Sequence, residues 1–472
     1  MGLSPDQLLC MLVRPPAGYG TGNKPNIKQG LYLLPQALPT LARVIEKKGA
    51  LPIVIDFEVN GWMLNEFLVE FQKTAPDILF FTTSTLSFCY CREMVSAVRQ
   101  VDNHVTIIFG GPHATYQWKS LLDERIADIV VLGEGEVALS QILDHYLHGR
   151  MLSECAGIAY MDDSGVPVAN ANCVITDNLS ALGTPAYEYI DMKSYRERVG
   201  KSSIEIVRGC PRGCKFCLNT KYYPTMRYKP IVDVVKEFEL LIETYGFEKL
   251  SVISPELVSD PGYVNKLLAT LESLLRGTRV TWACATTAMS LSPDVLEQMA
   301  KAHCRSIFIG VESGANEVQC AVGSKVDLSL LEDRMSMVKH AGIDVLASFI
   351  LGLPGETEAS AKQTIELAAS LKEKYKFIKS IQFNTFGPFP GTDIREDLER
   401  YRCIILPIDF AYYAVVPAVE SDSFPRETHY QLWHEVWKHF FPTYYDDYLE
   451  IERDALAGNN PRLAAFCGHT SK

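Results

Sequence analysis

The sequence predicts an α/β protein with a doubly wound, Rossmann-like parallel sheet first, a partial barrel of six βα units second and a helical cap last. Three observations lead to this fold class. Apolar, strand-like runs alternate with helix-like segments over the first 150 residues. The same alternation begins again after about residue 200, and such alternation is typical of parallel sheets. The end of the chain loses the alternation and becomes helical and aromatic.

Composition places the chain among ordinary globular proteins. It has 472 residues, of which 47% are hydrophobic and 22% charged, which indicates two or three domains. The net charge of −12 argues against a nucleic-acid-binding protein and against tight binding to anionic membranes. No segment has the pattern of a signal peptide or a membrane span. Thirteen cysteines then indicate a reducing cytoplasm, where thiols stay free unless they bind metal.

Five strands are expected in the first domain, residues 1–150. The strands are 8–16, 51–57, 77–85, 105–115 and 126–136, and the helices are 34–49, 64–76, 90–101 and 137–149. Ligands of a doubly wound sheet bind at the carboxyl ends of the strands. Small, hydroxyl and acidic residues there would let a large flat ligand approach the backbone, although glycines are also ordinary turn residues. The candidate ligand-binding residues are Thr82, Ser84, Gly110, Gly111, Gly133 and Glu134.

A connecting segment follows at residues 151–202. It contains a predicted small hairpin that turns at Ser164-Gly165, and then a stretch with proline and tyrosine. We expect a linker between two domains here.

Three cysteines come directly after the first strand of the middle region. The stretch "RGCPRGCKFCLN" contains Cys210, Cys214 and Cys217. A structural zinc site normally takes four ligands, often as two Cys-x-x-Cys pairs, and no second pair follows at a suitable distance. A zinc site or a chance group of thiols therefore fits this pattern poorly.

The spacing Cys-x-x-x-Cys-x-x-Cys resembles that of the radical SAM enzymes. The resemblance implies a [4Fe–4S] cluster whose three irons are held by the three thiolates. The fourth iron would bind S-adenosylmethionine (SAM) through its amino and carboxylate groups. Reductive cleavage of SAM would then give a 5′-deoxyadenosyl radical. Phe216 matches the aromatic residue usual between the last two cysteines, and we expect it to shield the cluster or contact adenine.

The middle domain, residues 203–395, continues as strand–helix units. Its strands are expected at 202–209, 248–256, 280–287, 306–315, 343–357 and 380–392, with helices at 230–246, 264–277, 292–304, 328–342 and 360–375. Six such units form a partial barrel with its site at the strand carboxyl ends. "IFIGVESG", "HAGIDVLASFILGLPGET" and "FGPFPGT" resemble the radical SAM core of enzymes that carry a cobalamin domain. By this resemblance Glu312 and Ser313 face the SAM ribose or methionine, and Gly352 and Pro354 line the adenine side. "GLPGET" is also explained by a strand-to-helix turn capped at Thr357.

The first domain shows a matching resemblance. "FTTST", "IIFGGPHAT" and "DIVVLGEGE", in this order, resemble the cobalamin-binding domain found before many radical SAM cores. The Asp-x-His-x-x-Gly motif that supplies a histidine to cobalt is absent, because "DFEVNG" has Glu58 in the histidine position. The resemblance implies cobalamin bound without histidine at cobalt, and a vestigial domain without cobalamin is the alternative.

The middle domain departs from the family pattern at two strand ends. The second strand usually ends in an acidic pair, whereas here it reads "SPELVSD", with Glu256 and Asp260 as the nearest carboxylates. The third strand often ends with an arginine, whereas here Thr286 and Thr287 follow. Both departures indicate a substrate that differs from those of commoner members.

Two further segments have more than one interpretation. Tyr222 and Tyr223 follow the cluster motif and would either donate hydrogen to a substrate radical, as catalytic residues, or pack on the sheet edge. The last 77 residues, 396–472, are expected to form a helical C-terminal domain. Its stripe of Trp433, Trp437 and Phe440 fits a core face, or the wall of an apolar substrate pocket.

The sequence thus predicts a radical SAM enzyme that modifies an unactivated carbon of a small, natural-product-like molecule. Cobalamin-dependent methylation is the first hypothesis. Cobalamin-independent dehydration, deoxygenation or rearrangement, as in the diol dehydratases of aminoglycoside pathways, is the second. A non-catalytic cobalamin or iron–sulfur sensor is a distant third. The expected partners are a small-molecule substrate and an electron donor such as flavodoxin or a reductase, without nucleic acid.

Overall fold

The structure is a computed structural model that describes residues 7–17, 33–170 and 175–468. The chain divides into two compact units, and each is described by itself. The first unit is formed by residues up to Val199 together with those from Asn460 onward, and the second is Gly200–Asn459.

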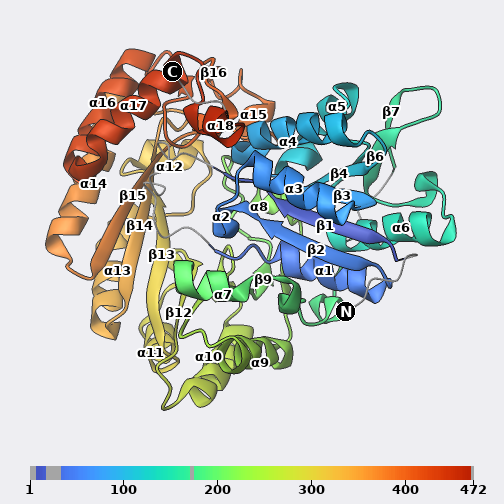
Figure 1. Ribbon diagram of the computed structural model, residues 1–472. Helices are drawn as coiled ribbons and strands as arrows, with labels where there is room; N and C mark the ends of the chain where they lie inside the picture. Colours follow the sequence, from blue (N-terminus) through green and yellow to red (C-terminus); the bar gives the residue numbers. More distant parts are fainter. Residues whose placement is uncertain (1–6, 18–32, 171–174, 469–472) are drawn as a thin grey trace. The chain divides into compact units, whose positions relative to one another are not determined.

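The first unit contains a seven-stranded sheet in the order β2-β1-β3-β4-β5-β6-β7 (Figure 1). Its parallel strands are β1 (Leu9–Arg14), β2 (Leu51–Asp56), β3 (Ile78–Thr82), β4 (Thr106–Gly110) and β5 (Ile129–Val131). Its main helices are α1 (Ala37–Lys47), α3 (Leu64–Thr74), α4 (Phe88–Val101), α5 (Pro112–Asp123) and α6 (Gly135–His148). The predicted doubly wound sheet and its five strands are confirmed. Apolar strands buried on both faces explain why they read as continuous hydrophobic runs.

Two helices of this unit lie outside the sequence prediction. The fourth strand was expected to run to residue 115, but it ends at Gly110 and α5 begins at Pro112. Proline is favoured at the first turn of a helix because it has no N–H to satisfy there. Helix α2 (Phe57–Asn60) follows β2 directly and is capped by the Asp56 carboxylate, which accepts a hydrogen bond from Glu58 N.

The predicted hairpin is confirmed, but it extends the sheet of the first unit. Strands β6 (Ile158–Met161) and β7 (Pro167–Ala169) pair with each other, and β6 pairs antiparallel with β5. The turn contains Gly165 at a φ of +77°, a conformation that glycine adopts without strain. The hairpin therefore satisfies the edge of β5, and the described residues after it, up to Val199, still belong to the first unit.

The end of the chain returns to the first unit. Helix α18 (Pro461–Phe466) places the Phe466 ring 5.7 Å from the ring of Phe57 and 5.3 Å from that of Tyr90. Phe466 is only 3% exposed and belongs to the core of this unit. The predicted C-terminal domain, 396–472, is thus divided between the two units. Its last helix, α18, belongs to the first unit, where the aromatic ring of Phe466 is buried.

The second unit contains six parallel strands in the order β15-β14-β13-β12-β11-β8. The strands are β8 (Ser202–Glu205), β11 (Lys249–Ile253), β12 (Thr281–Thr286), β13 (Cys304–Glu312), β14 (Asp344–Leu351) and β15 (Ile378–Thr385). The helices between them are α9 (Ile231–Glu239), α10 (Pro261–Leu275), α11 (Pro293–Lys301), α13 (Leu328–Ala341) and α14 (Glu358–Lys374). Strands that neighbour in sequence neighbour in the sheet, and the first and last do not pair. This is the predicted partial (β/α)6 barrel.

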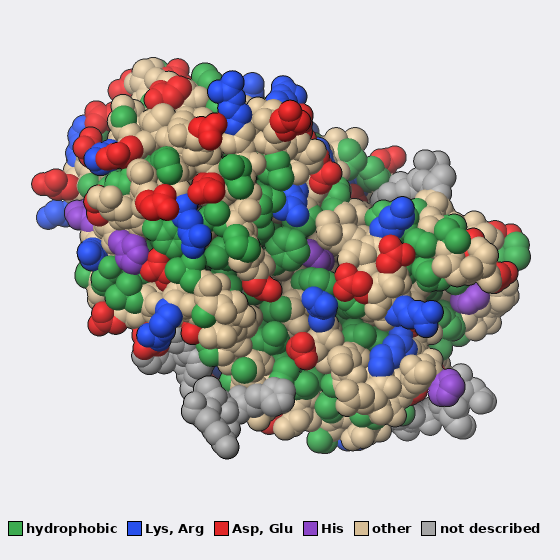
Figure 2. All heavy atoms as spheres, turned by 90° about the horizontal axis from the view of Figure 1, so that it is seen from above, with side chains coloured by type: hydrophobic (Ala, Val, Ile, Leu, Met, Phe, Trp, Pro, Cys, Tyr) green, Lys and Arg blue, Asp and Glu red, His purple; other side chains and the backbone are tan. Residues whose placement is uncertain are grey.

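A helical cap follows the barrel. It holds the short pair β16 (Ile404–Ile405) and β17 (Val419–Glu420), then α16 (Arg426–Phe440) and α17 (Tyr445–Leu456). Trp433, Trp437 and Phe440 of α16 are buried, so this aromatic stripe is a core face. Among the described residues, no helix combines the length and the apolar character needed to cross a bilayer. On the face seen in Figure 2, acidic and basic side chains are interspersed with apolar ones.

Candidate active site

The three cysteines of the motif, Cys210, Cys214 and Cys217, share one cavity at the carboxyl ends of the barrel strands. The cavity has a volume of about 310 Å³. Its lining residues are Cys210, Arg212, Cys214, Phe216, Cys217, Asn219, Pro255, Ala285, Thr286, Thr287, Phe308, Gly310, Glu312, Ser324, Lys325 and Val326. The cysteine loop, the second and third strand ends and β13 therefore meet at one place, as expected for a site of this barrel.

The cysteine loop is held by backbone contacts at its start and in its middle. At its start Gly209 has a φ of +91°, and a Cβ there would lie 2.5 Å from the carbonyl oxygen of Thr225, so the close passage requires glycine. In its middle, Lys215 N donates to Val322 O at 2.9 Å and Lys215 O accepts from Ile394 N at 3.4 Å. These contacts fix the backbone path of the loop that carries the three thiols.

The chemistry of these thiols fits a metal-bound group. Burial raises the pKa of all three, that of Cys214 to about 12. Thiols of this kind stay protonated near neutral pH, and a bound metal removes the proton. In the described part of the chain, no three His, Cys, Asp or Glu side chains are arranged around a single metal ion. Three thiolates on one loop are the kind of ligand that an iron–sulfur cluster takes.

A polar network joins the cysteine loop to both unusual strand ends. Glu256 is fully buried and accepts hydrogen bonds from Arg212 Nη2 at 3.0 Å and from Thr286 Oγ1. Arg212 also donates to the hydroxyls of Thr287 and Ser290. An arginine of the cysteine loop thus contacts Glu256 near the end of the second strand and Thr287 after the third. Asp260 is separate from this network, because its carboxylate caps α10 by accepting from Tyr263 N.

Glu312 lies in the cavity wall in an unusual conformation. Its φ is +68°, and the register between β13 and β14 shifts at this point. Burial raises the pKa of Glu312 to about 7. Non-glycine residues at positive φ are uncommon and concentrate at functional sites. Glu312 therefore presents a carboxyl group with a raised pKa beside the thiols.

Other predicted residues of this unit lie away from the cavity lining. Ser313 is fully buried, and its hydroxyl lies 3.2 Å from Thr364 Oγ1. Gly352 is backed by the His429 ring, which any side chain at this position would meet, and Pro354 lines a different pocket. Tyr222 and Tyr223 pack edge to face at 4.8 Å. The roles predicted for these residues stay predictions.

The structure brings the candidate residues of the first unit to one sheet edge. β3, β4 and β5 are consecutive in the sheet, and these residues end or follow those strands: Thr82, Ser84, Gly110, Gly111, Gly133 and Glu134. Their location agrees with the edge at which such sheets bind ligands. Ser84 is exposed and Glu134 is largely buried at the start of α6.

The two adjacent glycines of this edge differ in what they allow. Gly111 has a φ of +98°, and a Cβ there would lie 2.6 Å from the carbonyl oxygen of Thr83. The fold itself therefore requires this glycine, with or without a ligand. A Cβ at Gly110 would meet only the Val131 Cβ, at 3.7 Å, so Gly110 is the position that tests ligand access.

The histidine of this edge is held inside the unit. His113 is 1% exposed, its ring lies 4.3 Å from that of Phe88, and its Nδ1 is 3.2 Å from Thr85 Oγ1. Burial lowers the pKa of His113 to about 4. Glu58, in the motif position of a cobalt-binding histidine, accepts a hydrogen bond from Ala17 N at 2.7 Å. The His113 ring is thus packed inside the unit, and binding of cobalamin without histidine at cobalt stays a prediction.

Comparison with known proteins identifies both domains. The family model of the radical SAM superfamily matches residues 204–368, and that of the B12 binding domain matches residues 26–143. The chain is therefore an enzyme that combines a B12-binding domain with a radical SAM domain. Its cofactors are a [4Fe–4S] cluster, SAM and cobalamin.

Relatives extend over most of the chain. An uncharacterized methyltransferase of Pyrococcus horikoshii is 24% identical over 413 residues, which cover 86% of this chain and 87% of the relative. An anaerobic magnesium-protoporphyrin IX monomethyl ester cyclase of Rubrivivax gelatinosus is 24% identical over 389 residues, 79% of this chain and 67% of the relative.

Two solved structures share the fold. The radical SAM methyltransferase TsrM from Kitasatospora setae, with cobalamin and a [4Fe–4S] cluster bound, has a TM-score of 0.68 at 18% identity, covering 84% of this chain and 75% of that one. The cobalamin-dependent SAM radical enzyme OxsB with aqua-cobalamin has a TM-score of 0.73 at 16% identity, and the match covers 92% of this chain and 67% of that one.

Sequence reasoning missed the contribution of Arg212. The available signal was its position between Cys210 and Cys214, on a loop expected to lie beside two strand ends that depart from the family pattern. Arg212 pairs with Glu256, which lies 44 residues away in the sequence. Only the folded barrel brings the two side chains together, so the sequence alone does not reveal this pairing.

Proposed function

We propose that this enzyme methylates an unactivated carbon of a small, natural-product-like molecule in the cytoplasm, with cobalamin as methyl carrier. The observation that carries the proposal is the combination of a B12-binding domain with a cavity that gathers three cysteines and Glu312 at the barrel mouth. A methyltransferase name for the Pyrococcus horikoshii relative, which matches 86% of this chain, supports it.

The residues of the cavity have distinct roles in this proposal. When bound, the cluster with SAM supplies the radical that removes a hydrogen atom from the substrate, and cobalamin supplies the methyl group. Cys210, Cys214 and Cys217 hold the cluster. Arg212 and Glu256 fix the loop that carries these thiols. The Glu312 carboxyl orients a polar group of SAM, and the apolar side chains of the wall exclude water from the reacting carbon.

The proposed reaction also needs an electron donor for the cluster and cobalamin for the first unit. Cleavage of SAM consumes an electron, which we assign to a cytoplasmic donor such as flavodoxin or a reductase. Cobalamin would lie against the strand ends that carry Thr82, Gly110 and Gly133, without histidine at cobalt.

The test is anaerobic reconstitution with iron, sulfide and SAM, with and without cobalamin, followed by mass spectrometry of the product. We expect 5′-deoxyadenosine in both samples and a product heavier by one CH₂ only with cobalamin. The variant with Cys210, Cys214 and Cys217 all changed to Ala should lose cluster absorbance and all 5′-deoxyadenosine. Undiminished SAM cleavage by this variant would reject the assigned cluster site.

A second candidate function has its own observation. The Rubrivivax gelatinosus relative, which matches 79% of this chain at the same identity, is named as a cyclase. The architecture therefore also serves reactions that transfer no methyl group. Full turnover without cobalamin, to an unmethylated product, would favour this class or a dehydration over methylation.

A further inference from the structure

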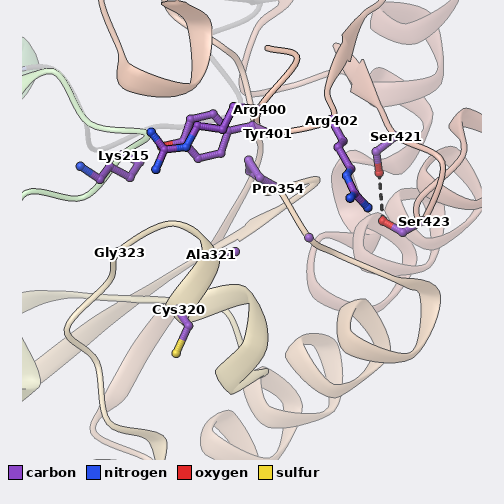
Figure 3. A pocket seen from close by; sticks show the side chains of 11 residues that line it. Lys215, Cys320, Ala321, Gly323, Pro354, Arg400, Tyr401, Arg402, Ser421 and Ser423 are labelled. Atoms are coloured by element: carbon purple, nitrogen blue, oxygen red, sulfur yellow. Dashed lines mark hydrogen bonds between the residues drawn. The ribbon is translucent and has the colours of Figure 1, made fainter. Parts of the chain in front are cut away.

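A second, larger pocket of the second unit lies behind the cysteine loop. It has a volume of about 440 Å³ and is separate from the cavity that the three cysteines line. Its lining residues are Lys215, Cys320, Ala321, Gly323, Pro354, Gly355, Arg400, Tyr401, Arg402, Ser421 and Ser423. Figure 3 shows Lys215, Arg400 and Tyr401 at one side, and Arg402 directed toward Ser423 at the other.

The pocket carries a local excess of positive charge. Three of its lining side chains are cations and none is a carboxylate. Lys215 and Lys221 share the single carboxylate of Asp393, at 2.9 and 2.6 Å. Among the described residues, no carboxylate pairs with Arg400 or Arg402; Arg400 lies 5.6 Å from the centre of the Tyr401 ring. In a chain of net charge −12, such a place attracts anionic groups and orients an approaching acidic partner.

The pocket is connected to the cluster site by the backbone of the cysteine loop. Lys215 lies between Cys214 and Phe216, which both line the cluster cavity, while its own side chain lines the basic pocket. Lys215 N is bonded to Val322 O at 2.9 Å, next to Gly323 of the pocket wall. The pocket is thus the rear face of the same loop whose front face holds the thiols. In the proposed function SAM and substrate bind at the front, so an electron that enters from the rear meets no obstruction from them.

We propose that this basic pocket is the docking site of an acidic one-electron carrier protein of the flavodoxin class. This inference rests on the proposed function, since only a reducible cluster needs such a carrier. One electron passes from the reduced carrier, which is oxidised, to the cluster, which is reduced; no bond or proton changes hands at the pocket. Arg400 and Arg402 are exposed, which suits the surface carboxylates of a protein better than a small ligand enclosed on all sides.

The adenine of SAM is the competing occupant, because Pro354 was predicted to line the adenine side. Adenine is uncharged and gives no reason for three cations around it. The two occupants also predict different effects of a substitution. Damage to a SAM pocket would impair SAM cleavage with every reductant, whereas damage to a carrier site would impair it only when the carrier supplies the electron.

The experiment compares the double variant Arg400→Glu/Arg402→Glu with a matched control, Arg276→Glu/Arg279→Glu. The control reverses two exposed arginines in the segment that precedes β12, at the opposite end of the barrel strands. Binding of a reduced or oxidised flavodoxin to the cluster-loaded enzyme is measured by calorimetry at several salt concentrations. SAM cleavage is then measured with flavodoxin and, separately, with dithionite.

For the pocket variant we expect flavodoxin affinity to fall at least about tenfold at low salt, with a weaker salt dependence. SAM cleavage driven by flavodoxin should fall in parallel, while cleavage driven by dithionite and the control variant should change less than about twofold. Unchanged flavodoxin affinity of the pocket variant would overturn the proposal, and so would a raised KM for SAM with dithionite. Absence of SAM cleavage by the wild-type enzyme under both reductants would instead reject the proposed function.

Discussion

Removal of the Arg212 side chain tests whether the polar network at the barrel mouth stabilises the second unit. Arg212→Ala would leave Glu256 fully buried without its cationic partner, since the Arg212 and Glu256 side chains are 18% and 0% exposed. Loss of one partner of a buried ion pair costs about 3–5 kcal/mol. Glu256 would keep hydrogen bonds from Thr286 and Thr287. We therefore expect a loss near the lower end, about 3 kcal/mol.

Urea unfolding followed by hydrogen exchange of peptides from β11 and β12 measures this loss in the second unit alone. Arg276→Ala is the matched control, because Arg276 is 76% exposed and its loss should change stability by less than about 0.5 kcal/mol. The double variant Arg212→Met/Glu256→Met should be more stable than the two single losses predict when added, with a coupling of about 2 kcal/mol. A cost of Arg212→Ala below about 1 kcal/mol, or strictly additive losses, would refute the reasoning.

Three further changes test other parts of the structure. Gly111→Ala should destabilise the first unit by about 2–4 kcal/mol, because it combines a strained positive φ with a contact on the Thr83 carbonyl. Gly110→Ala should cost less than about 1 kcal/mol. Equal effects of the two changes in urea unfolding would contradict this difference. Burial raises the pKa of Glu356 from 4.5 to about 8, so the folded state holds this proton more tightly and loses stability as pH rises through that window. Glu356→Gln should reduce this loss of stability between pH 4.5 and 8 by roughly 4 kcal/mol, and an unchanged pH profile of unfolding would count against it. Phe466→Ala should destabilise the first unit by about 3–5 kcal/mol, with the second unit as internal control; a change confined to the second unit would show that α18 packs elsewhere.

Local patterns predicted most of the fold. The strands of both sheets are short apolar runs, and their burial on two faces makes them visible in sequence. The cysteine motif is equally local, because Cys210, Cys214 and Cys217 lie within eight positions on one loop, and the structure brings them to one cavity. The strand-end residues of the first unit were also predictable, since parallel strands carry their ends to a common edge.

Long-range packing explains what the sequence did not reveal. The pairing of Arg212 with Glu256 depends on the approach of a loop to a strand end 44 residues away. Ser313 was expected at the cavity together with Glu312, but the β-bulge at Glu312 leaves its neighbour in the core against Thr364. Helix α18 shows no pattern that would separate it from the preceding helices, and only the Phe466 contacts assign it to the first unit.

The return of α18 to the first unit determines the order in which the molecule is completed during synthesis. Everything between Val199 and Asn460, 261 positions apart, belongs to the second unit. At about 5–20 residues per second, a ribosome needs roughly 13–50 s to make that stretch. Throughout this time the apolar surface around Phe57 and Tyr90 lacks the Phe466 ring that covers it in the complete chain. The domain that emerges first from the ribosome is therefore finished last, and its cofactor meets a closed core only after the barrel has been translated.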